Sequence, residues 1–224
     1  MVKAILIDID NTLLDFNASA TLAMNEAFTA HGLTFYPEMF KTFKRINDSL
    51  WLKIEKNEIT RSELHAVRFA LILKELGIEY EGKKIEKDFL ENLNHCAVKI
   101  DGAEDIMKYL SEKYVVCTAS NAPTVQCKTR LAYSGLNKYV KHEFISEEIG
   151  FAKPGKNFFD ACFEILSPIN KEETVMIGDS LSADVIGGVN YGLKTIWYNP
   201  CGGNAGEIKP FAEIQKLSDI KKLL

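Results

Sequence analysis

Short apolar runs alternate with amphipathic stretches along most of the chain. The first run, residues 3–7, is rich in β-branched and apolar side chains, which is typical of a strand buried on both faces. The stretches between the runs have helical periodicity and often end at a glycine or before a proline. Further runs of the same kind cover residues 114–118, 143–146, 174–177 and 195–198. This alternation predicts parallel βαβ units and an α/β protein with a Rossmann-like, doubly wound parallel sheet.

One long segment interrupts the alternation directly after the first predicted strand. Its pattern is helical throughout, and Thr60 with Glu63 matches a capping box at the start of one helix. At about 80 residues the segment is too long for an ordinary crossover connection. We therefore predict a helical cap subdomain over residues 16–96. It is inserted into a Rossmann-like core that comprises residues 1–15 and 97–224.

Composition narrows the class of protein. The chain has 224 residues, of which 46% are hydrophobic, so it can fill a sizeable core. Its formal net charge of −4 does not match the basic character of proteins that bind nucleic-acid polymers. The five cysteines are scattered without a CxxC pair, which argues against a zinc cluster or a disulfide framework. The apolar run at the N-terminus stops at Asp8, too early for a signal peptide or a membrane span, so we expect a cytoplasmic protein without membrane contact.

Polar side chains follow several of the predicted strands. Ligands of open parallel sheets bind at the carboxyl ends of the strands, so these residues are candidates for one common site. In chain order the candidates are Asp8, Asp10 and Thr12, then Thr118, Ala119, Ser120 and Asn121, then Lys153, and finally Asp179 and Asp184.

The residue types at these positions suit phosphate chemistry. Crowded carboxylates repel one another unless a cation neutralises them, and a set of oxygen ligands favours a hard ion such as Mg²⁺. Hydroxyl groups, backbone N–H groups and a lysine can bind phosphate oxygens. One carboxylate can attack phosphorus to form an aspartyl-phosphate, while a second transfers protons to the leaving group and from water.

Motifs along the chain resemble those of a known superfamily. The segment DIDNT, the hydroxyl of Thr118, the pair Lys153-Pro154 and the segment GDSLSAD resemble, in this order, the four motifs of the haloacid dehalogenase (HAD) superfamily. The helical insertion resembles the cap of the subfamily that includes β-phosphoglucomutase-like and nucleotidase members. Within that subfamily, DIDNTLLDF, ITRSELHAVRF and ISEEIGFAKP are most similar to bacterial pyrimidine 5′-nucleotidases.

The resemblance implies roles for the acidic residues. Asp8 is the expected nucleophile and Asp10 the expected general acid and base. The carboxylates of Asp8 and Asp179, with the backbone carbonyl of Asp10, are expected to hold Mg²⁺ as the cofactor. Asp184 is expected to steady these metal ligands.

The resemblance also implies residues that bind the substrate. Thr118, Ala119 and Lys153 are expected to bind the phosphate group. The following Ala119-Ser120 departs from the Asn-Gly that is more frequent in the family. In the cap, Arg61, His65 and Arg68 share a helical stripe that either faces the substrate or is solvated. Candidate contacts to the rest of the substrate are Asn121, Arg68 and Trp51.

We therefore expect a Mg²⁺-dependent phosphomonoester hydrolase that acts through an aspartyl-phosphate. Its expected substrates are small phosphorylated metabolites, in particular nucleoside 5′-monophosphates, and it is expected to be a monomer or a homodimer. A phosphosugar mutase of the same fold is the nearest alternative. A phospho-accepting signalling domain uses similar residues, but its usual chain lacks the long insertion. Dehalogenases of the superfamily lack the second aspartate, so Asp10 argues against that activity.

Overall fold

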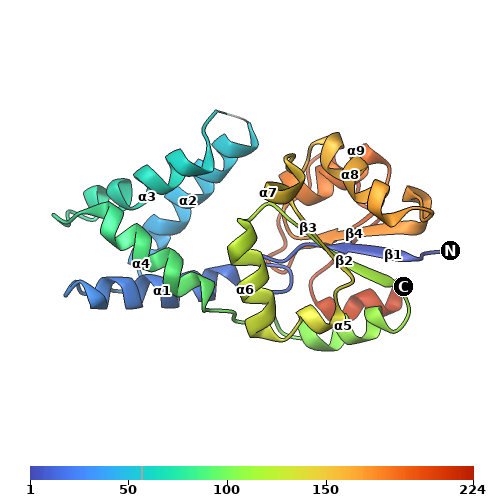
Figure 1. Ribbon diagram of the computed structural model, residues 1–224, viewed down its shortest axis with the longest axis horizontal. Helices are drawn as coiled ribbons and strands as arrows, with labels where there is room; N and C mark the ends of the chain where they lie inside the picture. Colours follow the sequence, from blue (N-terminus) through green and yellow to red (C-terminus); the bar gives the residue numbers. More distant parts are fainter. Residues whose placement is uncertain (57) are drawn as a thin grey trace. The chain divides into compact units, whose positions relative to one another are not determined.

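The chain is divided into two compact units. A computed structural model describes residues 1–56 and 58–224 (Figure 1). One unit, called here the α/β unit, comprises Met1–Asp15 and Val98–Leu224. The other, the helical unit, comprises Phe16–Ala97. Among the described residues, no helix is both long enough and apolar enough to cross a membrane.

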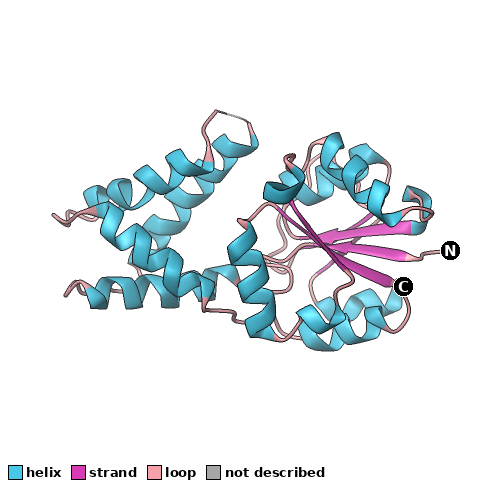
Figure 2. Cartoon of the chain, viewed as in Figure 1, coloured by secondary structure: helices cyan, strands magenta, loops and turns pink. Residues whose placement is uncertain are grey.

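The α/β unit is built on a parallel sheet (Figure 2). Within the described residues the sheet has six strands in the order β3-β2-β1-β4-β5-β6, and every neighbouring pair is parallel. The strands are β1 (Ala4–Ile7), β2 (Val115–Ser120), β3 (His142–Ile145), β4 (Thr174–Gly178), β5 (Lys194–Tyr198) and β6 (Ala212–Ile214). The chain therefore continues from β1 to β2 on one side of the sheet and later to β4 on the other side. This order is that of a Rossmann-like sheet, which confirms the predicted fold class, and it places a topological switch point between β1 and β4.

Helices cover both faces of the sheet. Figure 1 shows α8 and α9 on one face and α5 on the other. Phe158, Phe159 and Cys162 of α8 pack against Ala4 and Leu6 of β1 in one apolar cluster. The helices of this unit are α5 (Ala103–Ser111), α6 (Thr124–Ser134), α7 (Ser146–Ile149), α8 (Lys156–Leu166) and α9 (Ile186–Tyr191). A π-helical turn, Leu181–Val185, leads into α9, and short 3₁₀ turns cover Asn137–Tyr139, Lys171–Glu173 and Leu217–Lys222.

Two strands, β2 and β6, differ most from the sequence prediction, while the other strands agree with it to within one residue at each end. The strand β2 ends at Ser120, so the predicted end at residue 118 was wrong by two residues. In the sheet Thr118 is level with Ile7 of β1, and Ser120 extends beyond that level. The edge strand β6 was not predicted, because its three residues are too few to form a recognisable apolar run.

The helical unit consists, in its described part, of α1 (Phe16–Ala30), α2 (Met39–Glu55), α3 (Arg61–Glu75) and α4 (Gly82–Asn94). Helix α4 packs against both α1 and α3, and α2 packs against α3. The predicted capping box is present: the hydroxyl of Thr60 accepts a hydrogen bond from the Glu63 amide at 3.2 Å, and the Glu63 carboxylate accepts one from the Thr60 amide at 2.8 Å. This pair satisfies two backbone donors at the start of α3.

Helices α3 and α4 approach each other closely at Gly82. A Cβ atom at this position would lie 2.5 Å from the backbone nitrogen of Ala70, which cannot move without displacing α3. We expect Gly82→Ala to lower the free energy of unfolding by about 1–3 kcal/mol, the usual cost of overpacking. Chemical denaturation measures this loss. The neighbouring exposed Lys83→Ala serves as the control and should change stability by less than about 0.5 kcal/mol. An equal effect of the two substitutions would contradict the steric argument.

Candidate active site

An acidic cluster lies at the carboxyl ends of β1 and β4. Asp8 follows β1 directly, and its amide donates a hydrogen bond to the Ile177 carbonyl of β4 at 2.9 Å. Asp179 follows β4, and Asp184 lies in the π-helical turn after it. Carboxylate oxygens of Asp8, Asp179 and Asp184 lie within 4.8 Å of one another. The switch point of the sheet thus brings together three residues that the sequence analysis selected.

Gly178 permits this close approach. A Cβ atom at Gly178 would lie 2.2 Å from a carboxylate oxygen of Asp184. Only a residue without a side chain leaves room for this carboxylate beside the end of β4.

The side chain of Lys153 contacts two of the three aspartates of the acidic cluster. Its ammonium group is buried and donates hydrogen bonds to Asp8 Oδ1 at 2.7 Å and to Asp184 Oδ1 at 2.6 Å. It also donates to the carbonyl of Ala119 in β2. Although burial lowers the pKa of the Lys153 ammonium, the nearby carboxylates of Asp184 and Asp8 outweigh it and raise this pKa above its ordinary value. Lys153 therefore stays charged and ties the ends of three chain segments together.

The positive charge of Lys153 does not fully compensate the negative charges of the three carboxylates. Burial raises the pKa of Asp8 well above its ordinary value, and Lys153 offsets only part of this effect. Burial also raises the pKa of Asp179 to about 7, reinforced by the charge of Asp184 and opposed by Lys153 and a hydrogen bond from Thr12. Three carboxylates thus share one lysine, which is the arrangement that a bound cation completes.

The donor set fits a hard divalent cation. Both oxygens of Asp184 are already engaged, one by Lys153 and the other by the Ser180 amide at 3.1 Å. Asp8 and Asp179 each have one oxygen engaged by a side chain, Lys153 and Thr12 respectively, so they are better placed than Asp184 to offer an oxygen to an ion. Ligands made only of oxygen atoms match Mg²⁺. The geometry is therefore compatible with the roles that the resemblance implied, in which Asp8 and Asp179 bind the metal and Asp184 supports them.

Asp10 points to a different partner. The chain turns directly after Ile9, whose carbonyl accepts hydrogen bonds from the amides of Leu13 and Leu14 at 2.9 and 2.8 Å. Asn11 takes a left-handed conformation in this turn, with φ of 58°, which asparagine tolerates better than most residues. The Asp10 carboxylate accepts a hydrogen bond from the buried Arg130 of α6. Arg130 was not predicted from the sequence, although a charged residue within the apolar stripe of a helix was a usable signal.

The end of β2 contributes the hydroxyl of Ser120, to which no role was assigned from the sequence. Thr118 lies inside the strand, and among the described residues its buried hydroxyl has no hydrogen-bond partner. Ser120 is the last residue of β2, at the edge where Asp8 and Asp179 also lie. Its Oγ accepts a hydrogen bond from the Ala122 amide at 3.1 Å. Ser120 is therefore better placed than Thr118 to meet a ligand at the strand ends.

Asn121 fixes the main chain at Lys153. Its amide nitrogen donates to the Lys153 carbonyl at 2.8 Å, and its amide oxygen accepts from the Lys153 backbone N–H at 2.9 Å. On the opposite side of the cluster, the indole N–H of Trp197 in β5 donates to the Asp179 carbonyl at 2.9 Å. These bonds hold the loops that carry Lys153 and Asp179, a supporting function that the sequence did not reveal.

The two selected residues of the helical unit lie in or on its apolar core. Arg68 is buried, and its guanidinium group donates to Glu86 at 2.6 and 3.1 Å and to Asn47 at 2.8 Å. It also lies over the ring of Phe89, 4.8 Å from the ring centre. Trp51 is half-buried and packs against the same core. The donors of Arg68 are thus engaged inside the unit.

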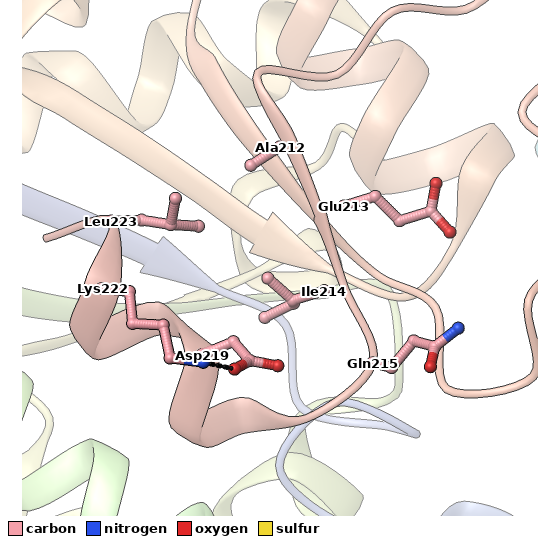
Figure 3. A pocket seen from close by; sticks show the side chains of 7 residues that line it. All are labelled: Ala212, Glu213, Ile214, Gln215, Asp219, Lys222 and Leu223. Carbon is pink, nitrogen blue, oxygen red and sulfur yellow. Dashed lines mark hydrogen bonds and ion pairs between the residues drawn. The ribbon is translucent and has the colours of Figure 1, made fainter.

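A cavity of about 550 Å³ lies elsewhere in the α/β unit, beside the edge strand β6 (Figure 3). Asp219 and Lys222, which line it, form an ion pair at 2.6 Å. Its remaining lining residues are Ala212, Glu213, Ile214, Gln215 and Leu223. None of the residues of the acidic cluster lines this cavity, so we do not assign the chemistry to it.

Comparison with known proteins agrees with this geometry. Residues 2–192 match the family model of haloacid dehalogenase-like hydrolases. The chain belongs to this family. The match confirms the resemblance that the motifs indicated.

Named relatives span nearly the whole chain. The HAD-hydrolase YfnB of Bacillus subtilis is 36% identical over 99% of this chain and 95% of its own. The crystal structure of YfnB bound to magnesium superposes with a TM-score of 0.93, covering 100% of this chain and 98% of that one. The pyrimidine 5′-nucleotidase PynA of Streptococcus pneumoniae is 33% identical over 97% of this chain and 93% of its own. The pyrimidine 5′-nucleotidase YjjG of Escherichia coli is 28% identical over 98% of this chain and 96% of its own.

Proposed function

We propose that this hydrolase is a Mg²⁺-dependent phosphatase of nucleoside 5′-monophosphates that acts through an aspartyl-phosphate on Asp8. The observation that carries the proposal is the cluster of Asp8, Asp179 and Asp184 around the buried Lys153 at the switch point of the sheet. The substrate class is supported by the activity named for PynA and YjjG. The Mg²⁺ is supported by the magnesium in the YfnB crystal structure and by the oxygen-only donor set.

The proposed reaction has two steps. In the first, a carboxylate oxygen of Asp8 attacks phosphorus, an O–P bond forms, and the bond between phosphorus and the leaving oxygen breaks. Asp10 gives its proton to the leaving oxygen. In the second step Asp10 takes a proton from water, whose oxygen attacks phosphorus and releases Asp8. Backbone N–H groups after β2 and the hydroxyl of Ser120 bind phosphate oxygens throughout. The three N–H groups of Lys153 are engaged by Asp8, Asp184 and the Ala119 carbonyl, so Lys153 donates to a phosphate oxygen in place of Asp8 once Asp8 attacks phosphorus.

The carboxylates of Asp8 and Asp179 and the backbone carbonyl of Asp10 would hold the Mg²⁺. Bound there, the ion supplies positive charge that lowers the repulsion between the Asp8 carboxylate and the phosphate group. Asp184 supports the site through its bonds to Lys153 and to the Ser180 amide.

A substrate screen tests the proposed function. The purified protein is freed of metal with EDTA, and about a hundred phosphorylated nucleotides, sugars and other metabolites are offered with and without Mg²⁺. We expect Mg²⁺-dependent phosphate release, with pyrimidine nucleoside monophosphates giving a higher kcat/KM than hexose phosphates. Isomerisation of glucose 1-phosphate would favour a phosphosugar mutase instead. Full activity after complete metal removal would overturn the metal dependence.

The acidic cluster also predicts how stability depends on pH. The pKa of Asp179 is raised to about 7 from its ordinary value, so the folded protein binds a proton between about pH 4 and pH 7 that the unfolded chain has released. The metal-free protein should therefore lose stability as the pH rises through this window. A cation that replaces the proton should remove the penalty. We expect thermal denaturation to show a larger stabilisation by Mg²⁺ at pH 8 than at pH 5, and an equal stabilisation at both would contradict this.

Ser120 and Thr118 offer a matched test of phosphate binding. Ser120→Ala removes a hydroxyl at the end of β2, where it can donate to a charged phosphate oxygen. Such a bond is worth about 1.5–3 kcal/mol, so kcat/KM should fall by about 10- to 100-fold. Thr118→Val removes a hydroxyl inside the same strand at nearly constant volume and should leave kcat/KM within about threefold. A larger loss of kcat/KM in Thr118→Val would show that Thr118 binds the phosphate group.

A further inference from the structure

Arg130 is a buried cation whose partner lies in the candidate active site. It belongs to α6 and is among the largest fully buried side chains of the described residues. Its Nη1 group donates a hydrogen bond to Asp10 Oδ1, a residue 120 positions earlier in the chain. Burying a guanidinium group costs several kcal/mol unless a paired anion offsets it, and an apolar side chain would fill the same space more cheaply. The presence of arginine here therefore calls for a reason other than packing.

Asp10 needs a fixed orientation if it is to transfer protons. Its side chain is 24% exposed, compared with 10% for Asp8, and it projects from the tight turn after Ile9. Lys153 holds Asp8 on one side of the cluster, whereas Asp10 is held by Arg130. General acid catalysis depends on geometry, and a misplacement of about 1 Å can cost a factor of about 100 in rate.

We propose that Arg130 is a positioning residue that holds the carboxyl group of Asp10 in the orientation required for proton transfer. This inference rests on the proposed phosphatase function. In this role Arg130 acts through Asp10 and not by binding the substrate itself. Its removal should therefore slow the reaction in proportion to how much the leaving oxygen needs a proton.

Two substrates with different leaving groups separate this role from a structural one. A nucleoside 5′-monophosphate releases an alkoxide that must be protonated, whereas p-nitrophenyl phosphate releases a stable phenolate. In Arg130→Met, which keeps the volume but has no donor, kcat for the first step should fall by about 100-fold with the nucleotide and by less than about fivefold with the aryl phosphate. Arg130→Lys retains a charged donor and should recover at least part of the nucleotide activity.

Chemical rescue adds a readout that packing does not influence. In Arg130→Ala, millimolar guanidinium should restore nucleotide hydrolysis, and urea, which is of similar shape but neutral, should not. Leu131→Ala is the matched control, because Leu131 is the adjacent buried residue of α6 and has no charge. It should lower the turnover of both substrates by the same factor.

The outcomes distinguish the inference from the proposed function. Equal losses with both substrates in Arg130→Met, or a selective loss in Leu131→Ala, would overturn the positioning role of Arg130. If Arg130→Ala does not fold, the Met and Lys variants still provide the test, because a loss that is larger with the nucleotide than with the aryl phosphate supports the positioning role and an equal loss overturns it. A wild-type protein that releases phosphate from neither substrate would instead overturn the proposed function.

Discussion

Asp8→Asn should abolish turnover, whereas Asp10→Asn should trap the enzyme after its first step. The amide introduced by Asp8→Asn cannot attack phosphorus, so no covalent intermediate should form with any substrate. Asp10→Asn leaves the attack by Asp8 possible, but the new amide cannot move protons. With p-nitrophenyl phosphate the first step should largely survive, because its leaving group hardly needs a proton. Hydrolysis of the intermediate should then slow by about 10²–10⁴-fold, and phosphate should accumulate on Asp8.

Acid-quenched mass spectrometry of the intact protein after a pulse of p-nitrophenyl phosphate measures this accumulation. Circular dichroism of both variants provides the control, since Asp10→Asn also leaves the buried Arg130 without its charged partner. A phosphate adduct on the Asp8→Asn variant, or normal steady-state turnover by Asp10→Asn, would show that the two roles are wrongly assigned.

The sheet and the acidic cluster could be predicted because both follow from strong local patterns. Strands buried on both faces produce continuous apolar runs, and parallel strands must present their carboxyl ends at one edge. Asp8 and Asp179 could be grouped from this topology alone, whereas Lys153, eight residues after the end of β3, was grouped with them by the order of the motifs. The boundary of β2 was harder to predict, because Ala119 and Ser120 are small and continue the strand without an apolar signal.

Contacts between distant segments could not be predicted in the same way. The pairing of Arg130 with Asp10 joins helix α6 to the turn after β1, and neither segment contains a sequence pattern that predicts contact with the other. Arg68 shows the same limit within the helical unit. Its helical stripe with Arg61 and His65 could be read as solvated or as facing a substrate. In the structure Arg68 is buried, because Glu86 of α4 provides a charged partner for it.

Lys153→Met should have large effects on both activity and stability. The substitution keeps most of the side-chain volume but removes the cation that pairs with Asp8 and Asp184. Breaking a buried ion pair from one side costs about 3–5 kcal/mol, so the free energy of unfolding should fall by this amount at pH 7. Turnover at saturating Mg²⁺ should fall by about 10²–10³-fold, because a charged donor to the phosphate in the transition state is lost.

The sign of the pH dependence separates lost charge from lost packing. Without Lys153 nothing offsets the burial that raises the pKa of Asp8, so this carboxyl group should bind a proton more readily in the folded protein. Because protonation removes the uncompensated charge, the stability that Lys153→Met loses relative to the wild type should become smaller as the pH falls from 8 to 5, as measured by chemical denaturation of both proteins. Cys162→Ala is the packing control, since it removes a buried neutral side chain of α8 in the same unit. Its stability loss should be nearly independent of pH over this range, and the same flat profile in Lys153→Met would show that Lys153 acts through volume and not through charge.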